Sequence, residues 1–252
     1  MFCRRPALAR GRAFFFVAGL AFFVAGCAPA GHAPEPGTRQ HPDLSGLWMR
    51  KDVPGIRRNS FSADNPPLQP AAMAVFTANR GGVPMNADTD PPDKMDPLTH
   101  CYPAGVPRVM LLNLNTPMEI VQSEQQVHIL FERHPLARRI YLGRGHPVGY
   151  PDSYMGHSVG KWDGDTLVVD TVALQAATWL DGAGTPHSDA LHVVERFRRV
   201  DANNLEVEFL FEDPKAFTGS WGGKKYYRLA PEAEVLEYVP CEERLQPLTT
   251  VQ

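Results

Sequence analysis

The stretch HSVGKWDGDTLVVDT, residues 157–171, decides the fold class. Its two halves are short runs rich in β-branched residues, and the dipeptide Asp163-Gly164 between them favours a two-residue type I′ turn. Counting back from that turn places His157 opposite Asp170 on the returning strand. The stretch therefore predicts an antiparallel hairpin with an imidazole facing a carboxylate. Such a pair is either a general-base arrangement or a modest cross-strand contact on the surface.

A second hairpin is predicted between residues 190–200 and 204–212. Apolar and charged residues alternate along NLEVEFLFE, so one face of this strand is buried and the other carries glutamates. Matching the apolar faces of the two strands turns Glu195 inward and His192 outward. An inward carboxylate must be paired or have a raised pKa. We expect a buried ion pair with an arginine, with a catalytic acid as the alternative.

Outward from these hairpins, the sequence continues as short β-branched or aromatic runs separated by turn residues. These runs span residues 44–48, 118–123, 126–132, 138–143, 224–230 and 234–239. Residues 53–108 are irregular by contrast, and one short helix is predicted in AAMAVFTANR, residues 71–80. We therefore expect a mainly all-β fold. An antiparallel up-and-down meander would close into a calycin-like barrel or form a two-sheet sandwich.

The N-terminus has the pattern of an export signal. Four arginines and no acid in residues 1–12 precede the apolar run of residues 13–26, which is too short for an ordinary membrane-spanning helix. The run ends in Val-Ala-Gly-Cys27, which resembles the lipobox of bacterial lipoproteins. We expect cleavage before Cys27 and its lipidation, with an ordinary signal peptide as the alternative. Because Ala28 rather than an aspartate follows, the resemblance implies anchoring in the outer membrane, facing the periplasm of a Gram-negative bacterium.

The rest of the chain is expected to form one domain on a tether. The segments are a signal peptide (1–26), a lipidated cysteine with a Pro-rich tether (27–42), a β-barrel-like domain (43–245) and a tail (246–252). Loss of the signal changes the formal net charge from −3 to −7, because four arginines leave and no acid does. An acidic domain is a poor partner for nucleic acid or for anionic lipid head groups, so membrane contact is expected through the lipid anchor alone.

Two cysteines remain after the signal and the lipidation site, namely Cys101 and Cys241. In an oxidising compartment an isolated pair is a candidate disulfide, and closing a loop of this length stabilises a fold by roughly 4–5 kcal/mol in the chain-entropy model. We expect this disulfide, with two buried thiols as the alternative.

The loop TWLDGAGTPHSD, residues 178–189, is the densest polar segment. It offers Asp181 and His187 as catalytic candidates, and Trp179 and Ser188 as ligand-binding candidates. Gly-rich connections on rigid scaffolds often carry function. Local turn formation explains the glycines, the proline and the aspartates equally well, but it does not explain both Trp179 and His187. We therefore expect a functional site that includes this loop.

Motifs for metals and organic cofactors are absent from the sequence. His187 and His192 are separated by four residues, but they fall in a predicted loop and strand and lack the helical geometry of the His-Glu-x-x-His zinc motif. Nucleophile-elbow, P-loop and dinucleotide-binding patterns do not occur. We expect neither a metal nor a cofactor.

Several strings together are similar to a large family of uncharacterised exported bacterial proteins. They are CYPAGVPR (101–108), HSVGKWDGDTLVVDT (157–171), WLD (179–181), PHSD (186–189), ERF (195–197), EDPK (212–215) and Trp221. The resemblance covers residues 43–243. It implies a common fold and a shared site around His157, Asp181 and His187, but no activity. Gly46-Leu47-Trp48 also resembles the Gly-x-Trp signature of lipocalins and related calycin barrels, which implies a fold and not a function.

The leading functional hypothesis is a lipoprotein that binds a small, largely apolar molecule in a barrel pocket. Its few polar or aromatic contacts would come from Trp179, Glu195, His157 and His187. One alternative is a cofactor-free hydrolase, lyase or isomerase on the same scaffold, using the acid–base candidates named above. The other is a structural or assembly lipoprotein without a pocket.

Overall fold

The computed structural model describes residues 41–79, 96–112, 115–132 and 136–237. The chain divides into two units, Met1–Thr38 and Arg39–Gln252, and every described residue belongs to the second. Cys27 and Cys241 lie outside the described residues, so the lipidation and the Cys101–Cys241 disulfide stay predictions. Within the described part of the chain, no helix has the length and apolar character needed to cross a membrane.

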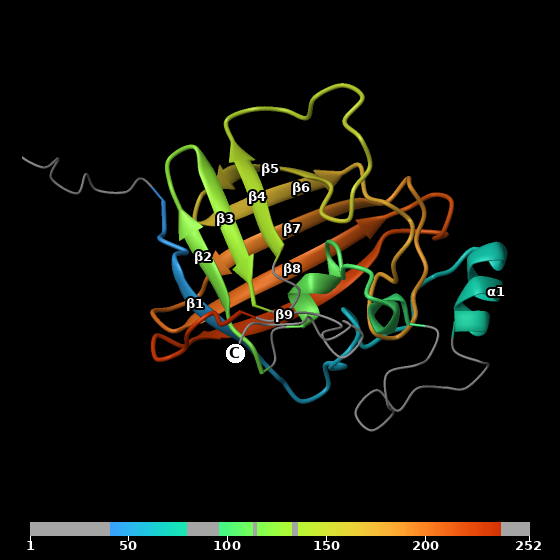
Figure 1. Cartoon of the computed structure of the whole chain (residues 1–252), viewed down its shortest axis with the longest axis horizontal. Coiled ribbons are helices and arrows are strands. Elements are labelled where there is room, and N and C mark those ends of the chain that lie inside the picture. Colours follow the sequence, from blue (N-terminus) through green and yellow to red (C-terminus); the bar gives the residue numbers. More distant parts are fainter. Residues whose placement is uncertain (1–40, 80–95, 113–114, 133–135, 238–252) are drawn as a thin grey trace, which may run out of the picture. The chain divides into compact units, whose positions relative to one another are not determined.

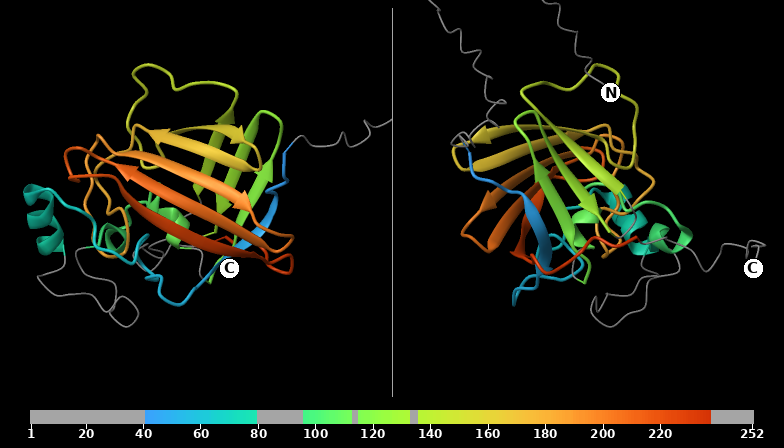
Figure 2. Two further views of the ribbon diagram at one scale, coloured as in Figure 1. Left: turned by 180° about the vertical axis from the view of Figure 1, so that it is seen from behind. Right: turned by 60° about the vertical axis from the view of Figure 1, so that its left-hand side comes forward.

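Nine strands in the described residues form a closed barrel (Figures 1 and 2). They are β1 (Gly46–Lys51), β2 (Met118–Gln122), β3 (Gln126–Phe131), β4 (Leu136–Leu142), β5 (His157–Asp163), β6 (Thr166–Val172), β7 (His192–Arg199), β8 (Asn204–Glu212) and β9 (Trp221–Leu229). Each strand pairs with its neighbour in the sequence, and β1 pairs with β9 to close the ring. The all-β barrel is therefore confirmed. Of the run 234–239, the described residues 234–237 form no strand.

One pairing departs from the expected meander. β4 and β5 run parallel, with Ile140 opposite Ser158, whereas the other pairs of this barrel are antiparallel. Parallel strands cannot be joined by a tight turn. Residues 143–156 therefore form a crossover that arches over the side of the barrel (Figure 1).

The predicted register of the first hairpin is wrong: the two-residue loop lies one position further along the chain, which moves the partners on the returning strand by two residues. The two-residue loop is Gly164-Asp165, and Asp163 pairs with Thr166. Gly164 has φ 58°, and a type II′ turn places glycine at this first loop position, whereas the expected type I′ turn places it second. His157 consequently lies opposite Val172 rather than Asp170.

The described residues between β1 and β2 form three short helices. The predicted helix is present as α1 (Pro70–Asn79), with Pro70 at its first position, and it lies beside one end of the barrel (Figure 2). The other two are the 3-10 turns η1 (Pro97–His100) and η2 (Arg108–Leu111). All four residues of η2 are buried, so this turn is part of the core.

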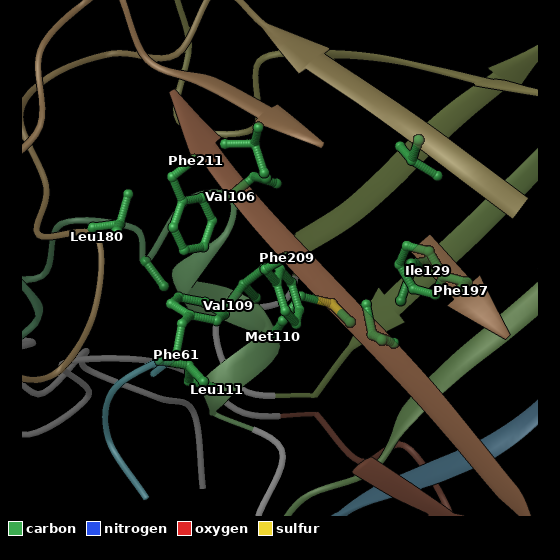
Figure 3. Close-up of a cluster of buried hydrophobic side chains, with 14 of the residues drawn as sticks. Phe61, Val106, Val109, Met110, Leu111, Ile129, Leu180, Phe197, Phe209 and Phe211 are labelled. Atoms are coloured by element: carbon green, nitrogen blue, oxygen red, sulfur yellow. The ribbon is translucent and has the colours of Figure 1, made fainter. Parts of the chain in front are cut away.

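Aromatic and aliphatic side chains fill the barrel around η2 (Figure 3). The ring of Phe61 lies 4.6 Å from that of Phe209 and 4.9 Å from that of Phe211, measured between centroids. Val109 and Met110 of η2 are fully buried in the same cluster. Side chains of the protein itself thus occupy this part of the interior.

Candidate functional site

Three histidines and two carboxylates form a hydrogen-bonded row on the outer face of β5 to β8. In order, the row consists of His157, His146, Asp170, His192 and Glu212. The Nδ1 atoms of His157 and His146 are 2.8 Å apart, and His146 Nε2 lies 2.9 Å from Asp170 Oδ1. His192 Nε2 lies 2.9 Å from Asp170 Oδ2, and His192 Nδ1 lies 3.0 Å from Glu212 Oε2. We call these five residues the outer-face row.

Strand alternation and the crossover together build this row. The neighbours of Asp170 on β6 are buried, so its own side chain points outward. His192 and Glu212 lie directly opposite each other on β7 and β8. His146 comes from the crossover and bridges His157 to Asp170. The expected direct contact between His157 and Asp170 is thus replaced by a contact through a third residue.

His157 is the most buried member of the row, with 2 % of its surface exposed. Tyr141 stacks on its ring at 5.2 Å, and Tyr150 of the crossover lies at 4.6 Å, both measured between centroids. The guanidinium of Arg144 lies over the ring of Tyr141, 3.3 Å from its centroid. The crossover thereby encloses His157, while the rest of the row stays half-exposed.

The histidines of the row differ in their proton affinity. Burial, with the neighbouring charges of His146 and Arg144, lowers the pKa of His157. Burial also opposes charge on His192, but its hydrogen bonds to Asp170 and Glu212 outweigh this and raise its pKa. Hydrogen bonds from the two histidines likewise outweigh burial at Asp170 and lower its pKa. His157 therefore takes up a proton less readily than an ordinary histidine, and His192 takes one up more readily.

Replacing His146 by alanine should separate the two ends of this row. We expect the pKa of His157 to rise, because a like charge is removed, while His192 keeps its raised pKa through Glu212. Ring NMR signals followed between about pH 5 and 8 measure both values. As the pH falls below about 6.5, protonation of His157 lowers the free energy of unfolding, because its pKa is lower in the folded protein. Protonation of His192 raises the free energy of unfolding in the same range. His128→Gln, a histidine of β3 bonded to Gln126, is the control, and equal titration of His157 and His192 would contradict the assignment.

Glu195 lies inside the barrel and forms the buried ion pair that its position predicts. Arg138 Nη1 donates to Glu195 Oε1 at 2.9 Å, and Nη2 donates to the other carboxylate oxygen. Ser158 and Thr171 accept further hydrogen bonds from the same guanidinium. The side chains of Arg138 and Glu195 are 1 % and 0 % exposed. Glu195 therefore has a structural partner and lies away from the outer-face row.

Asp181 is fully buried in the loop between β6 and β7. Its Oδ1 accepts from the backbone N–H groups of Ala183 and Thr185, so it organises the turn in which it lies. Burial raises the pKa of this carboxyl, although the hydroxyls of Ser60 and Thr185 and the charge of Arg108 oppose the shift. Asp181 is thus the candidate whose environment most favours a neutral acid, but neither His157 nor Glu195 is among its contacts.

The remaining candidates of this loop have local partners. His187 is buried with a lowered pKa, and its Nδ1 lies 3.1 Å from the carbonyl of Ser188. Ser188 donates through its hydroxyl to Asp213 at 2.8 Å. The ring of Trp179 lies 5.7 Å from the guanidinium of Arg108. These contacts fasten the loop to η2 and to the end of β8.

A small cleft opens where β1 and β9 adjoin the segment after β1. Five basic residues and one acidic residue supply the charges of its lining, together with Val53, Ile56 and Tyr226. The charged residues are Arg50, Lys51, Asp52, Arg57, Lys224 and Lys225. We call this the cationic cleft.

Much of the positive charge in the cationic cleft is uncompensated. Asp52 is paired with Arg58, which lies 2.8 Å away and is not part of the lining, and with Arg50 of the lining at 3.7 Å. Lys224 is paired with Glu206 at 3.3 Å. Lys51 and Arg57 are exposed, and the structure gives neither an ion pair in its described residues. The cleft therefore presents positive potential on a protein of net negative charge.

Comparisons with known proteins leave the chain unassigned to a family. No family model, no curated protein and no solved structure matches it. The described residues also contain no group of three or more histidine, cysteine or acidic side chains arranged to hold a metal ion. The resemblance noted in the sequence therefore stays a prediction.

The structure separates the residues that the sequence analysis expected in one site. His157 and Asp170 lie in the outer-face row, Glu195 lies inside the barrel, and Asp181 and His187 lie in the loop after β6. Sequence reasoning missed His146, Glu212 and the cationic cleft. The segment RKDVPGIRR, residues 50–58, carried a usable signal for the cleft, because it gathers four basic residues in an acidic protein.

Proposed function

We propose that this protein binds a small anionic molecule in the cationic cleft, outside the cytoplasm, where its N-terminal signal directs it. The observation that carries the proposal is the excess of basic over acidic side chains lining one cleft of an otherwise acidic domain. Carboxylate and phosphate groups are the usual partners of such side chains. A lipid anchor on Cys27 would hold the domain at the membrane surface.

The cationic cleft changes the expected chemistry of the ligand. An apolar ligand would need space inside the barrel, and Phe61, Phe209, Phe211 and η2 pack there. The cleft instead exposes Lys51 and Arg57 beside the buried Arg50. A ligand with one or more negative charges fits this lining better than an apolar one.

Calorimetric titration of the purified full-length protein with phosphate, citrate and acetate tests this proposal. We expect binding that weakens with added salt, because exposed charges are screened. Lys51→Gln and Arg57→Gln should each weaken it by about tenfold or more, which corresponds to the loss of one charge-assisted hydrogen bond. Lys161→Gln, an exposed lysine of β5 outside the cleft, is the matched control. Absence of binding by every anion, or an equal loss in the control, would sink the proposal.

A second candidate function is acid–base catalysis at the outer-face row. Its support is the neutral, enclosed imidazole of His157 in continuous hydrogen-bond contact with the carboxylate of Asp170 through His146. A chain of this kind can accept a proton at one end and release it at another. The His146→Ala variant described above tests the row itself. Turnover that survives this variant would exclude catalysis through the row.

A further inference from the structure

The buried amine of Lys225 is a feature of the cationic cleft that anion binding alone does not use. β9 places Lys225 between the buried Tyr227 and Gly223 on the inward face, and 3 % of the residue is exposed. Its Nζ donates to the backbone carbonyl of Arg57 at 2.6 Å, which fixes the amine in the lining of the cleft. A lysine is seldom buried without an ion pair, because burial disfavours its charged form. The salt bridges of the described residues include none for Lys225.

The surroundings of Lys225 favour the neutral amine. Burial and the nearby guanidinium of Arg50 lower its pKa to about 8, although Asp52 and Asp181 oppose the shift. At neutral pH it therefore carries on the order of 100-fold more free amine than an ordinary lysine. Desolvation and an adjacent cation are the two devices by which enzymes activate lysine nucleophiles.

We propose that Lys225 forms a reversible imine with a small carbonyl compound that also carries a carboxylate, such as a 2-oxo acid. This inference rests on the proposed anion site, because Lys51 and Arg57 would hold the carboxylate while the carbonyl carbon meets Nζ. The neutral amine adds to the carbonyl carbon and forms the N–C bond. The carbonyl oxygen then leaves as water with the two amine protons, so the step needs no oxidant or reductant.

The geometry favours this class of ligand over a simple inorganic anion. Exposed cations line the mouth of the cleft, and the amine lies deeper, at a buried position. A ligand with an anionic group at one end and an electrophilic carbon beside it satisfies both regions. The basic side chains of the lining also stabilise the negative carboxylate that lies next to the imine.

Borohydride trapping on the purified full-length protein tests the inference. Pyruvate is the probe, and peptide mass spectrometry locates the reduced adduct. We expect a single pyruvate adduct at Lys225, at least about tenfold more abundant than adducts at the exposed Lys161 or Lys215, because far more of its amine is neutral. The yield should rise with pH up to about pH 8, and Lys51→Gln should lower it.

One variant and a phosphate titration of the wild-type protein separate failure of this inference from failure of anion binding. Lys225→Arg keeps the positive charge but cannot form an imine, so it should abolish trapping, while phosphate binding is measured on the wild-type protein. Adducts spread evenly over exposed lysines, with phosphate still bound, would overturn the imine and leave the anion site standing. Loss of phosphate binding by the wild-type protein would overturn both. Because the wild-type adduct pattern decides the question, the inference stays testable even if Lys225→Arg does not fold.

Discussion

Replacement of Arg138 by methionine is expected to lower the free energy of unfolding by roughly 3–5 kcal/mol, because Glu195 would be left buried without its cation. Both side chains are essentially inaccessible to water, and Ser158 and Thr171 complete the hydrogen bonds of the guanidinium. Urea unfolding followed by tryptophan fluorescence measures the loss. A decrease below about 1 kcal/mol would show that the pair is not the structural element we describe.

Two further variants define what the Arg138 result means. Arg139→Met changes the next residue of β4, which points outward and is exposed, so its effect should stay within about 1 kcal/mol. The double variant Arg138→Met with Glu195→Leu removes both charges together. It should recover most of the loss, because an apolar pair of similar volume does not have to compensate for burying ions. Failure to recover would indicate that the polar network also fixes the local packing.

Replacement of Gly223 by alanine is expected to destabilise the barrel by roughly 1–3 kcal/mol or more, as overpacking does. A Cβ atom at this position of β9 would lie 2.1 Å from the carbonyl oxygen of Phe61 and 2.9 Å from its carbonyl carbon. Backbone atoms cannot swing aside as a flexible side chain does, so the segment carrying Phe61 would have to move. That movement would displace the ring of Phe61 from its contacts with Phe209 and Phe211.

Gly219→Ala is the matched control for this experiment. It lies in the same part of the chain, before β9, and a Cβ added there meets no atom within 4 Å. We expect its unfolding midpoint in urea to match that of the wild type or to rise slightly, since alanine reduces the entropy of the unfolded chain. Equal destabilisation by the two variants would show that the close approach of Phe61 is not the cause.

The parts of the fold that were predictable depend on alternation within single strands. The pattern of β8 fixed its buried face, and from it followed the inward position of Glu195 and the outward position of His192. Both orientations are confirmed, and so is the ion pair of Glu195. The helix at residues 70–79 was predictable for a similarly local reason, because prolines precede it.

What sequence reasoning missed depends on contacts between distant segments. Moving the two-residue loop by one position shifts the pairing by two residues and moves His157 away from Asp170, because the register of a strand depends on the turn. The parallel β4–β5 pair has no short-range signal, so the crossover and His146 were not anticipated. The cationic cleft likewise joins Arg50 to Lys225, which belong to opposite ends of the chain and meet only when the barrel closes.

Closure of the barrel by β1 and β9 also has a consequence for the order of folding. The hairpins of β5 to β9 contain mostly local pairings, whereas the β1–β9 contact closes a loop of nearly the whole domain and is entropically the slowest to form. During synthesis from the N-terminus, β1 can pair only with β2 until β9 has been made. A chain truncated before Trp221 would keep open edges on both β1 and β8, and unpaired edges of this kind recruit other chains.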